Sequence, residues 1–317
     1  MERNKIGIAL GGGAARGWAH IGVLKALSAY GLTPHIIAGT SIGAVVGGCH
    51  AAGKLDQLEE FVTQLTPRSV LRFLDLDMTG GGLMSGVRLR RTLDRELDNI
   101  GIEDLEQTFV AVATEIGSGR EIWLTKGPLV AAIRASYALP GIFKPIQING
   151  RWLMDGAFVN PVPVAVCRAM GASLVIGVNL HHGGISRTAL TPMEATALDS
   201  ASVDLVNASE ATEEEAAQKK RRIPSLRGLR HQVFGQGNGQ NTPGITRVLL
   251  EAFNITQDRI GRARLAGDPP DIVITPRLGN MGLFDFHKSK PAIAEGYEAT
   301  MRQLDEIEQT SAELAAE

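Results

Sequence analysis

Two shortages limit what this 317-residue chain can be. It has only two cysteines, Cys49 and Cys167, which argues against a disulfide framework and fits a reducing compartment. Its charges nearly cancel, and the formal net charge of −2 gives no basic surplus of the kind that nucleic-acid binding requires. We therefore expect neither a disulfide-rich secreted domain nor a nucleic-acid partner.

Segments that would direct the chain into or across a membrane are also missing. The N-terminus, MERNKIGIAL, lacks the apolar core and the cleavage site of a signal peptide. The stretch from Ala26 to Gly53 contains no Asp, Glu, Lys or Arg, but Pro34, His35 and several glycines interrupt it. A buried strand, turn and helix explain this stretch better than a membrane span does. We expect a cytoplasmic protein.

What the sequence does contain is glycine and alternating apolar patterns. Its 37 glycines exceed the usual share of roughly 7%, which predicts many tight turns or close backbone approaches. Short apolar runs alternate with helical patterns, as is typical of βαβ units in a mainly parallel sheet. The expected strands are 5–10, 35–40, 108–116, 119–125, 150–156, 173–180 and 270–276, and the expected helices are 17–31, 42–53 and about Pro291 to Gln309.

The composition changes between about residues 182 and 244. EATEEEAAQKKRR is acidic and then basic, and GQGNGQNTPG is a polar, glycine-rich turn cluster. We interpret this region as a polar, mobile insertion in a single domain that spans residues 1–317. Within it, Lys219 to Arg230 places six basic residues beside three apolar ones. This segment is either a solvated charged loop or a peripheral contact with an anionic membrane surface.

The stretch LGGGAARG, from Leu10 to Gly17, follows an expected strand and opens a helix, where backbone N–H groups can bind an anion. The dinucleotide fingerprint is not met, because Arg16 stands at its third glycine position and residues 31–36 contain no acidic side chain. The Walker pattern is not met either, because Trp18 stands where a lysine is required. Two interpretations remain: donors for a transient oxyanion, or a turn that serves close packing only.

A candidate nucleophile lies in the sequence Gly39-Thr40-Ser41-Ile42-Gly43, which fits G-x-S-x-G between an expected strand and an expected helix. In a nucleophile elbow, small residues let the chain turn sharply and leave the serine Oγ exposed at the helix start. This context favours a nucleophilic Ser41 over a serine that merely caps the helix.

A nucleophilic serine needs a group that accepts its proton, and two interpretations compete. A Ser-His-Asp triad would use His181 or His182, which follow an expected strand but stand in no recognisable signature. Alternatively, Asp155 ends an expected strand, and Gly156 permits a turn that leaves its carboxylate at the edge where Ser41 also emerges. Such a carboxylate can act as general base without a histidine. No cluster of His, Cys, Asp and Glu has metal-ligand spacing.

Taken in order, GGAARG, GTSIG and DGA resemble the motifs of patatin-like phospholipases. The match is closest to the bacterial branch that is similar to the esterase domain of neuropathy target esterase. RASYALPGIFKP (residues 134–145), NPVPV after the aspartate and the tail PDIVITPRLGNMGLFDF also resemble this family. The resemblance thus covers nearly the whole chain apart from much of the insertion.

The resemblance implies a three-layer α/β/α fold with a mainly parallel sheet and hydrolysis of lipid acyl esters, of phospholipase A or lysophospholipase type, without metal or cofactor. It makes Ser41 the nucleophile and Asp155 the base. Ala14 departs from the pattern, since many members have a third glycine there, but its backbone donor is kept. The implied oxyanion hole is Gly12, Gly13, Ala14 and Arg16, and the supporting motif glycines are Gly17, Gly39, Gly43 and Gly156. A non-catalytic regulator that keeps this fold stays open as an alternative, as does peripheral contact with the inner membrane face.

Overall fold

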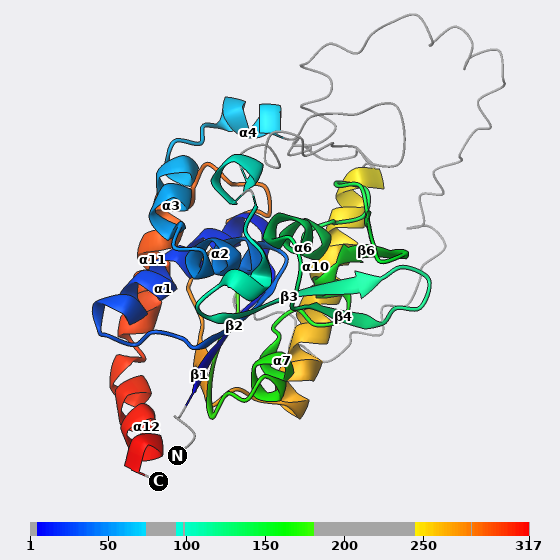
Figure 1. Ribbon diagram of the computed structural model, residues 1–317. Coiled ribbons are helices and arrows are strands. Elements are labelled where there is room, and N and C mark those ends of the chain that lie inside the picture. The colour runs from blue at the N-terminus through cyan, green and yellow to red at the C-terminus, as the bar shows by residue number, and fades with distance from the viewer. Residues whose placement is uncertain (1–4, 74–92, 98, 181–244, 280, 317) are drawn as a thin grey trace, which may run out of the picture. The chain divides into compact units, whose positions relative to one another are not determined.

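The computed structural model describes residues 5–73, 93–97, 99–180, 245–279 and 281–316 (Figure 1). The chain divides into two units, one of residues 1–184 with 253–317 and one of residues 185–252. The first unit contains the sheet. His181, His182, the segment Lys219 to Arg230 and the rest of the expected insertion lie outside the described residues.

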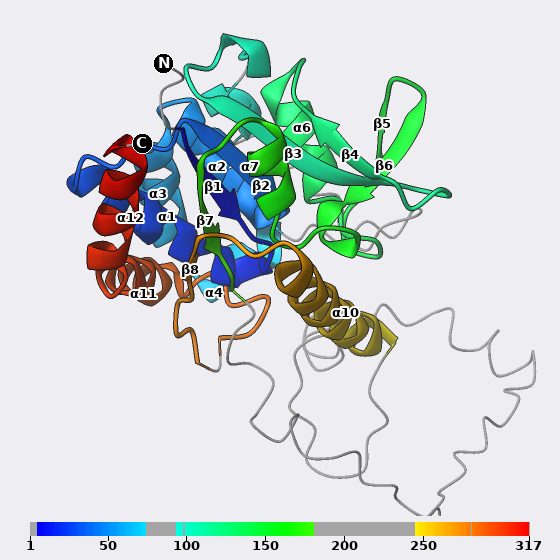
Figure 2. The same ribbon diagram turned by 90° about the horizontal axis from the view of Figure 1, so that it is seen from below.

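The centre of the first unit is an eight-stranded sheet in the order β5-β6-β3-β2-β1-β7-β8, with β4 paired to β3. Five strands run parallel: β1 (Ile6–Leu10), β2 (Ile36–Thr40), β3 (Thr108–Glu115), β7 (Leu174–Val178) and β8 (Ile272–Ile274). β4 (Glu121–Leu124), β5 (Ile146–Ile148) and β6 (Arg151–Asp155) form the antiparallel end. Figure 2 shows β7 and β8 on one side of β1, with β2 and β3 on the other. The expected mainly parallel sheet is confirmed.

Helices cover both faces of this sheet because its strands are apolar on both sides. On β3, Phe109 and Ala111 belong to one apolar cluster, whereas Val110 and Val112 belong to another. The first cluster packs against α1 (Ala19–Ala29), α2 (Ile42–Ala51), α3 (Leu55–Thr63), α6 (Leu129–Ser136) and α11 (Ser289–Met301). The second packs against α7 (Val164–Ala169) and the end of α10 (Ile245–Gly267). The result is the expected three-layer α/β/α arrangement.

The remaining elements are short or peripheral: η1 (Ala14–Trp18), α4 (Pro67–Phe73), η2 (Ile102–Asp104), η3 (Gly156–Phe158) and α12 (Leu304–Ala316). The single helix expected from Pro291 to Gln309 was wrong, because the chain turns at Arg302 and Gln303 and divides it into α11 and α12. Among the described residues, no helix is both long enough and apolar enough to span a bilayer.

The α1–α11 pair is held unusually close by two glycines. A Cβ on Gly22 of α1 would collide with the backbone carbonyl of Ile293, and a Cβ on Gly296 of α11 would collide with that of Ala19. Backbone therefore packs directly on backbone at this crossing, without side chains between the helices. Because α1 follows the glycine-rich loop and η1, this contact also fixes the base of that loop.

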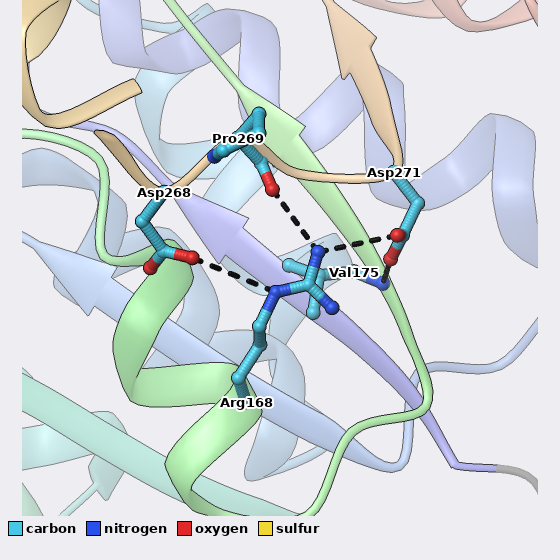
Figure 3. Close-up of polar contacts among 5 residues, drawn as sticks. All are labelled: Arg168, Val175, Asp268, Pro269 and Asp271. Atoms are coloured by element: carbon cyan, nitrogen blue, oxygen red, sulfur yellow. Dashed lines mark hydrogen bonds and ion pairs between the residues drawn. The ribbon is translucent and has the colours of Figure 1, made fainter. Parts of the chain in front are cut away.

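At the other end of the strands, a polar cluster ties α7 to the start of β8 (Figure 3). Arg168 donates hydrogen bonds to the carbonyl of Pro269 at 3.0 Å and to Asp271 Oδ1 at 3.1 Å, and its Nε lies 3.6 Å from Asp268 Oδ1. Asp271 Oδ2 in turn accepts the N–H of Val175 at 2.6 Å. One arginine thus links α7 and the α10–β8 connection, and Asp271 carries the link on to β7.

Candidate active site

Ser41 occupies the turn between β2 and α2, with φ 57° and ψ −120°. An L-residue rarely adopts this conformation, and a structure keeps such strain only where its surroundings impose it. Two hydrogen bonds do so here. The Ser41 N–H donates to Ser136 Oγ at 2.9 Å, and Thr40 Oγ1 donates to the carbonyl of Asn160 at 2.8 Å. The elbow predicted from the pentapeptide therefore exists, and α6 supplies one of its supports.

The motif glycines around Ser41 are required by close packing. A Cβ on Gly43 would collide with the carbonyl of Leu10, and one on Gly39 would come within 2.6 Å of the Ala44 backbone nitrogen. A Cβ on Gly17 would overlap the Ile42 side chain. The first turn of α2 thus lies directly against the end of β1 and the glycine-rich loop.

The hydroxyl of Ser41 donates a hydrogen bond to Asp155 Oδ2 at 2.6 Å. Asp155 Oδ1 accepts the N–H of Ala157 at 2.9 Å, so both carboxylate oxygens have a donor. Ser41 is 9% exposed and Asp155 1% exposed. The backbone is fixed as well, because Thr114 Oγ1 donates to the Asp155 carbonyl at 2.8 Å.

The route by which Asp155 reaches Ser41 differs from the sequence-based expectation. Asp155 does end a strand, but β6 is antiparallel to β3, so it does not run beside β2 in the same direction. Asp155 pairs with Ala113 on β3, one residue beyond Val112, which pairs with Thr40. β3 extends past the end of β2. The ends of β2 and β6 therefore reach the same point from opposite directions, β2 running parallel to β3 and β6 antiparallel to it. A Cβ on Gly156 would collide with the carbonyl of Val112, so this junction requires glycine.

Burial governs the electrostatics of this pair. It raises the pKa of Asp155 from 3.8 to about 7, against the opposing effect of the hydrogen bonds from Ser41 and Ala157. A carboxyl with a pKa near neutrality is a far better proton acceptor than an exposed aspartate, and it still ionises at physiological pH. The arrangement can therefore deprotonate the serine during an attack on a carbonyl carbon.

The glycine-rich loop borders the nucleophile. A Cβ on Gly12 would lie 3.7 Å from Ser41 Cβ and 3.4 Å from Ala157 Cβ. The amide of Gly12 itself donates to the Pro161 carbonyl at 2.9 Å, so this donor is already occupied. Within the described residues, the amides of Gly13 and Ala14 donate to no other group. Among the described residues, the amides of Gly13 and Ala14 are therefore the expected donors that remain available to bind an anion.

Arg16 and its neighbours attach the loop to the segment 281–286. Arg16 Nε donates to the Met281 carbonyl at 2.9 Å, the Ala15 N–H donates to the Leu283 carbonyl at 3.0 Å, and Trp18 Nε1 donates to the Phe286 carbonyl at 3.1 Å. Arg16 thus has a role in fixing the loop, which sequence reasoning could not separate from a role in the oxyanion hole.

His20 fixes the same loop from α1. Its Nε2 lies 2.8 Å from the Gly11 carbonyl, and the side chain is fully buried. Burial lowers the pKa of His20 from 6.5 to about 4, against the opposing effect of the hydrogen bond to Gly11. The imidazole is therefore neutral at physiological pH, and Nε2 carries the proton because a carbonyl can only accept. Neutral His20 holds the Gly11 carbonyl turned toward α1.

Sequence reasoning missed two supports of the site, Ser136 and Asn160. Ser136 lies in the RASYALPG stretch, but no local pattern reveals that its hydroxyl meets the Ser41 amide 95 residues away. Asn160 follows Asp155 closely, and its Nδ2 donates to Glu121 Oε1 at 2.8 Å, while Arg264 of α10 lies 3.3 Å from the other oxygen of Glu121. In the described part of the chain, no group of three or more His, Cys, Asp or Glu side chains could hold a metal ion.

Comparisons with known proteins identify the family of this chain. The family model described as patatin-like phospholipase matches residues 8–168. An uncharacterized NTE family protein of Mycobacterium tuberculosis is 33% identical over 343 residues, covering 98% of this chain and 94% of that protein. Human patatin-like phospholipase domain-containing protein 6 is 36% identical over 188 residues, which are 57% of this chain and 14% of that protein.

Among solved structures, VipD from Legionella pneumophila covers 96% of this chain and 67% of its own, with a TM-score of 0.45 and 14% identity. The family match includes the glycine-rich loop, the serine elbow and the aspartate. The chain belongs to the patatin-like phospholipase family, a family of lipid ester hydrolases.

Proposed function

We propose that this protein hydrolyses the acyl ester bonds of phospholipids or lysophospholipids through a catalytic dyad of Ser41 and Asp155. The observation that carries the proposal is the 2.6 Å hydrogen bond from Ser41 Oγ to Asp155 Oδ2 at a strained strand–helix turn. A serine is a weak nucleophile until a neighbouring base accepts its proton, and Asp155 stands at that position.

In the first half of the reaction, Ser41 Oγ attacks the ester carbonyl carbon while its proton passes to Asp155. The carbonyl π electrons move onto oxygen and give a tetrahedral oxyanion. When the intermediate collapses, the C–O bond to the alcohol breaks, and Asp155 returns the proton to the departing alkoxide. In the second half, Asp155 takes a proton from water, hydroxide adds to the acyl-enzyme, and Ser41 leaves with that proton.

The oxyanion needs donors that are in place before charge develops, because reorienting them during the reaction would cost energy. We assign this role to the amides of Gly13 and Ala14. The sequence led us to expect four residues in the oxyanion hole. We leave out Gly12, because its amide already donates to the Pro161 carbonyl. In this assignment Arg16 and neutral His20 hold the loop in shape and do not contact the oxyanion.

The histidine triad is the alternative mechanism, with His181 or His182 as base. The geometry around Ser41 favours the dyad, because the serine hydroxyl is directed at a carboxylate whose other oxygen is also occupied. Peripheral binding of an anionic membrane by Lys219 to Arg230 and a cytoplasmic location at the inner membrane face stay proposals that rest on sequence alone. Equal binding to neutral and anionic vesicles would exclude the membrane contact.

Fatty-acid release from phosphatidylcholine and lysophosphatidylcholine vesicles tests the proposed function. We expect Ser41→Ala to lower the rate on the order of 10³-fold or more, because it removes the hydroxyl that donates to Asp155. The double variant His181→Ala/His182→Ala serves as the control and is expected to retain its rate. Retained hydrolysis in Ser41→Ala, or a loss confined to the histidine variant, would contradict the dyad.

A further inference from the structure

One face of α10 lies along the segment that follows Asp155. Phe253, Gln257 and Gly261 are spaced four residues apart, so they share this face. The Phe253 ring centroid lies 4.8 Å from that of Phe158, and a Cβ on Gly261 would contact Pro161 at 3.7 Å. Gln257 stands between these two contacts on the same helix face.

The carboxamide of Gln257 borders the space between the nucleophile and the glycine-rich loop. Its Oε1 lies 3.6 Å from the position that a Cβ on Gly12 would take, and Ser41 Cβ lies 3.7 Å from the same position. Both groups thus lie within 4 Å of one point on the face of the loop that looks toward Ser41. No motif of the sequence analysis includes Gln257.

This carboxamide is nearly buried and has no hydrogen-bond partner among the residues that the structure describes. Gln257 is 3% exposed, yet within the described residues its side chain makes no hydrogen bond. Nearly buried polar groups normally have a hydrogen-bond partner. The adjacent Asp258 shows the usual solution, because it pairs with Arg262 at 2.9 Å one turn along the helix. The Gln257 carboxamide is therefore available to a molecule that occupies the site.

We propose that the Gln257 carboxamide, turned about its terminal bond so that Nε2 takes the place of Oε1, donates a hydrogen bond to the carbonyl oxygen of the substrate ester as that oxygen becomes the oxyanion. This inference rests on the proposed function and adds a side-chain donor to the backbone donors of Gly13 and Ala14. Gln257 is then a catalytic residue, and it lies outside the family-model match of residues 8–168.

A neutral donor suits this position for an electrostatic reason. A lysine or arginine beside Ser41 would favour the ionised form of Asp155, the partner of the serine, and weaken it as a proton acceptor. A glutamate would repel both the carboxylate and the developing oxyanion. A carboxamide stabilises the oxyanion through its N–H dipole and leaves the charge of the dyad unchanged.

The test compares Gln257→Met, which keeps the approximate volume and removes the donor, with Gln257→Glu, which keeps the shape and adds charge. We expect kcat to fall by about 10²-fold in both, with KM changed by less than about threefold. The loss should be equal for a phospholipid and for a p-nitrophenyl acyl ester, because both contain the acyl carbonyl that Gln257 contacts in this proposal and they differ in the alcohol part. Thr256→Val, on the exposed side of α10, is the matched control and should retain wild-type kcat.

The outcomes separate this inference from the proposed function. An unchanged kcat in folded Gln257→Met would overturn the role of Gln257 as an oxyanion donor. A raised KM for the phospholipid with unchanged kinetics for the p-nitrophenyl ester would also overturn it, because that pattern indicates a contact with the head group. Thermal unfolding verifies that each variant is folded. If Gln257→Met does not fold, the kcat of Gln257→Glu provides the test instead. Turnover that survives Ser41→Ala would instead reject the dyad itself, whatever Gln257 does.

Discussion

Replacing Asp155 with Asn is expected to lower kcat by about 10²–10⁴-fold, because Asn keeps the shape and loses the capacity to accept the serine proton. The measurement is steady-state hydrolysis of a p-nitrophenyl acyl ester. Asp271→Asn is the control: Asp271 also accepts a backbone N–H, but it lies in the cluster of Figure 3 at the other end of the strands. A fall in kcat of similar size in both variants would assign the effect to stability and would contradict the role of Asp155 as base.

The same variant has a signature in its pH dependence. In the wild type, activity should rise with pH through about 7, where Asp155 ionises, because only the carboxylate accepts a proton. For stability the sign is opposite. Between pH 3.8 and about 7 the folded state binds a proton that the unfolded state does not, so stability is fully present at low pH and is lost as the pH rises through 7.

The Asp155→Asn variant lacks this loss of stability with rising pH, because Asn does not ionise. We expect its melting temperature to increase relative to the wild type as the pH rises from 4 to 8. His20 acts in the other direction, since its pKa is lowered to about 4 and its stabilising neutral form is lost in acid. It is present in both proteins, so its contribution cancels in the difference. A difference in melting temperature that does not vary with pH would contradict the raised pKa of Asp155.

The largest effect on stability is expected from Gly22→Ala at the α1–α11 crossing. Adding one methyl group normally improves a helix slightly, but here the new Cβ would collide with the Ile293 carbonyl, and backbone cannot move aside as a side chain can. We expect a loss of about 3 kcal/mol or more in the free energy of unfolding. Urea denaturation followed by far-UV circular dichroism measures it.

Gly267→Ala at the end of α10 is the matched control, because a Cβ there would meet no atom within 4 Å. Its free energy of unfolding should change by less than about 0.5 kcal/mol. Equal stability of Gly22→Ala and the wild type would show that the two helices are not in backbone contact. Loss of esterase activity in folded Gly22→Ala would further indicate that the crossing fixes the glycine-rich loop.

The sequence was most informative where chemistry depends on neighbours along the chain. The elbow at Ser41 was predictable because strand, turn and helix are consecutive and glycine is needed at fixed offsets from the serine. The turn at Asp155 was predictable for the same reason. The direction of its strand was not, because strand order and pairing depend on contacts between distant segments. Sequence alone placed Asp155 correctly at a strand end but gave the wrong reason for its closeness to Ser41.

Contacts over long separations explain the other differences. Occupation of the Gly12 amide depends on Pro161, and support of the Ser41 amide depends on Ser136, neither of which has a local signature. No sequence pattern singled out α10, whose mixed charged and polar character follows a region of biased composition. Its four-residue spacing of Phe253, Gln257 and Gly261 acquires meaning only once the segment 158–161 is known to lie against it.

Labelling by a fluorophosphonate probe tests the central claim most directly, because the probe phosphonylates an activated serine without requiring the correct lipid. Intact mass and peptide mapping would be compared for the wild type, Ser41→Ala, Asp155→Asn and His181→Ala/His182→Ala. The account predicts one adduct on Ser41 in the wild type and in the histidine variant, none in Ser41→Ala, and strongly slowed labelling in Asp155→Asn. An adduct on another residue, or labelling that survives in Asp155→Asn and disappears without the histidines, would contradict it.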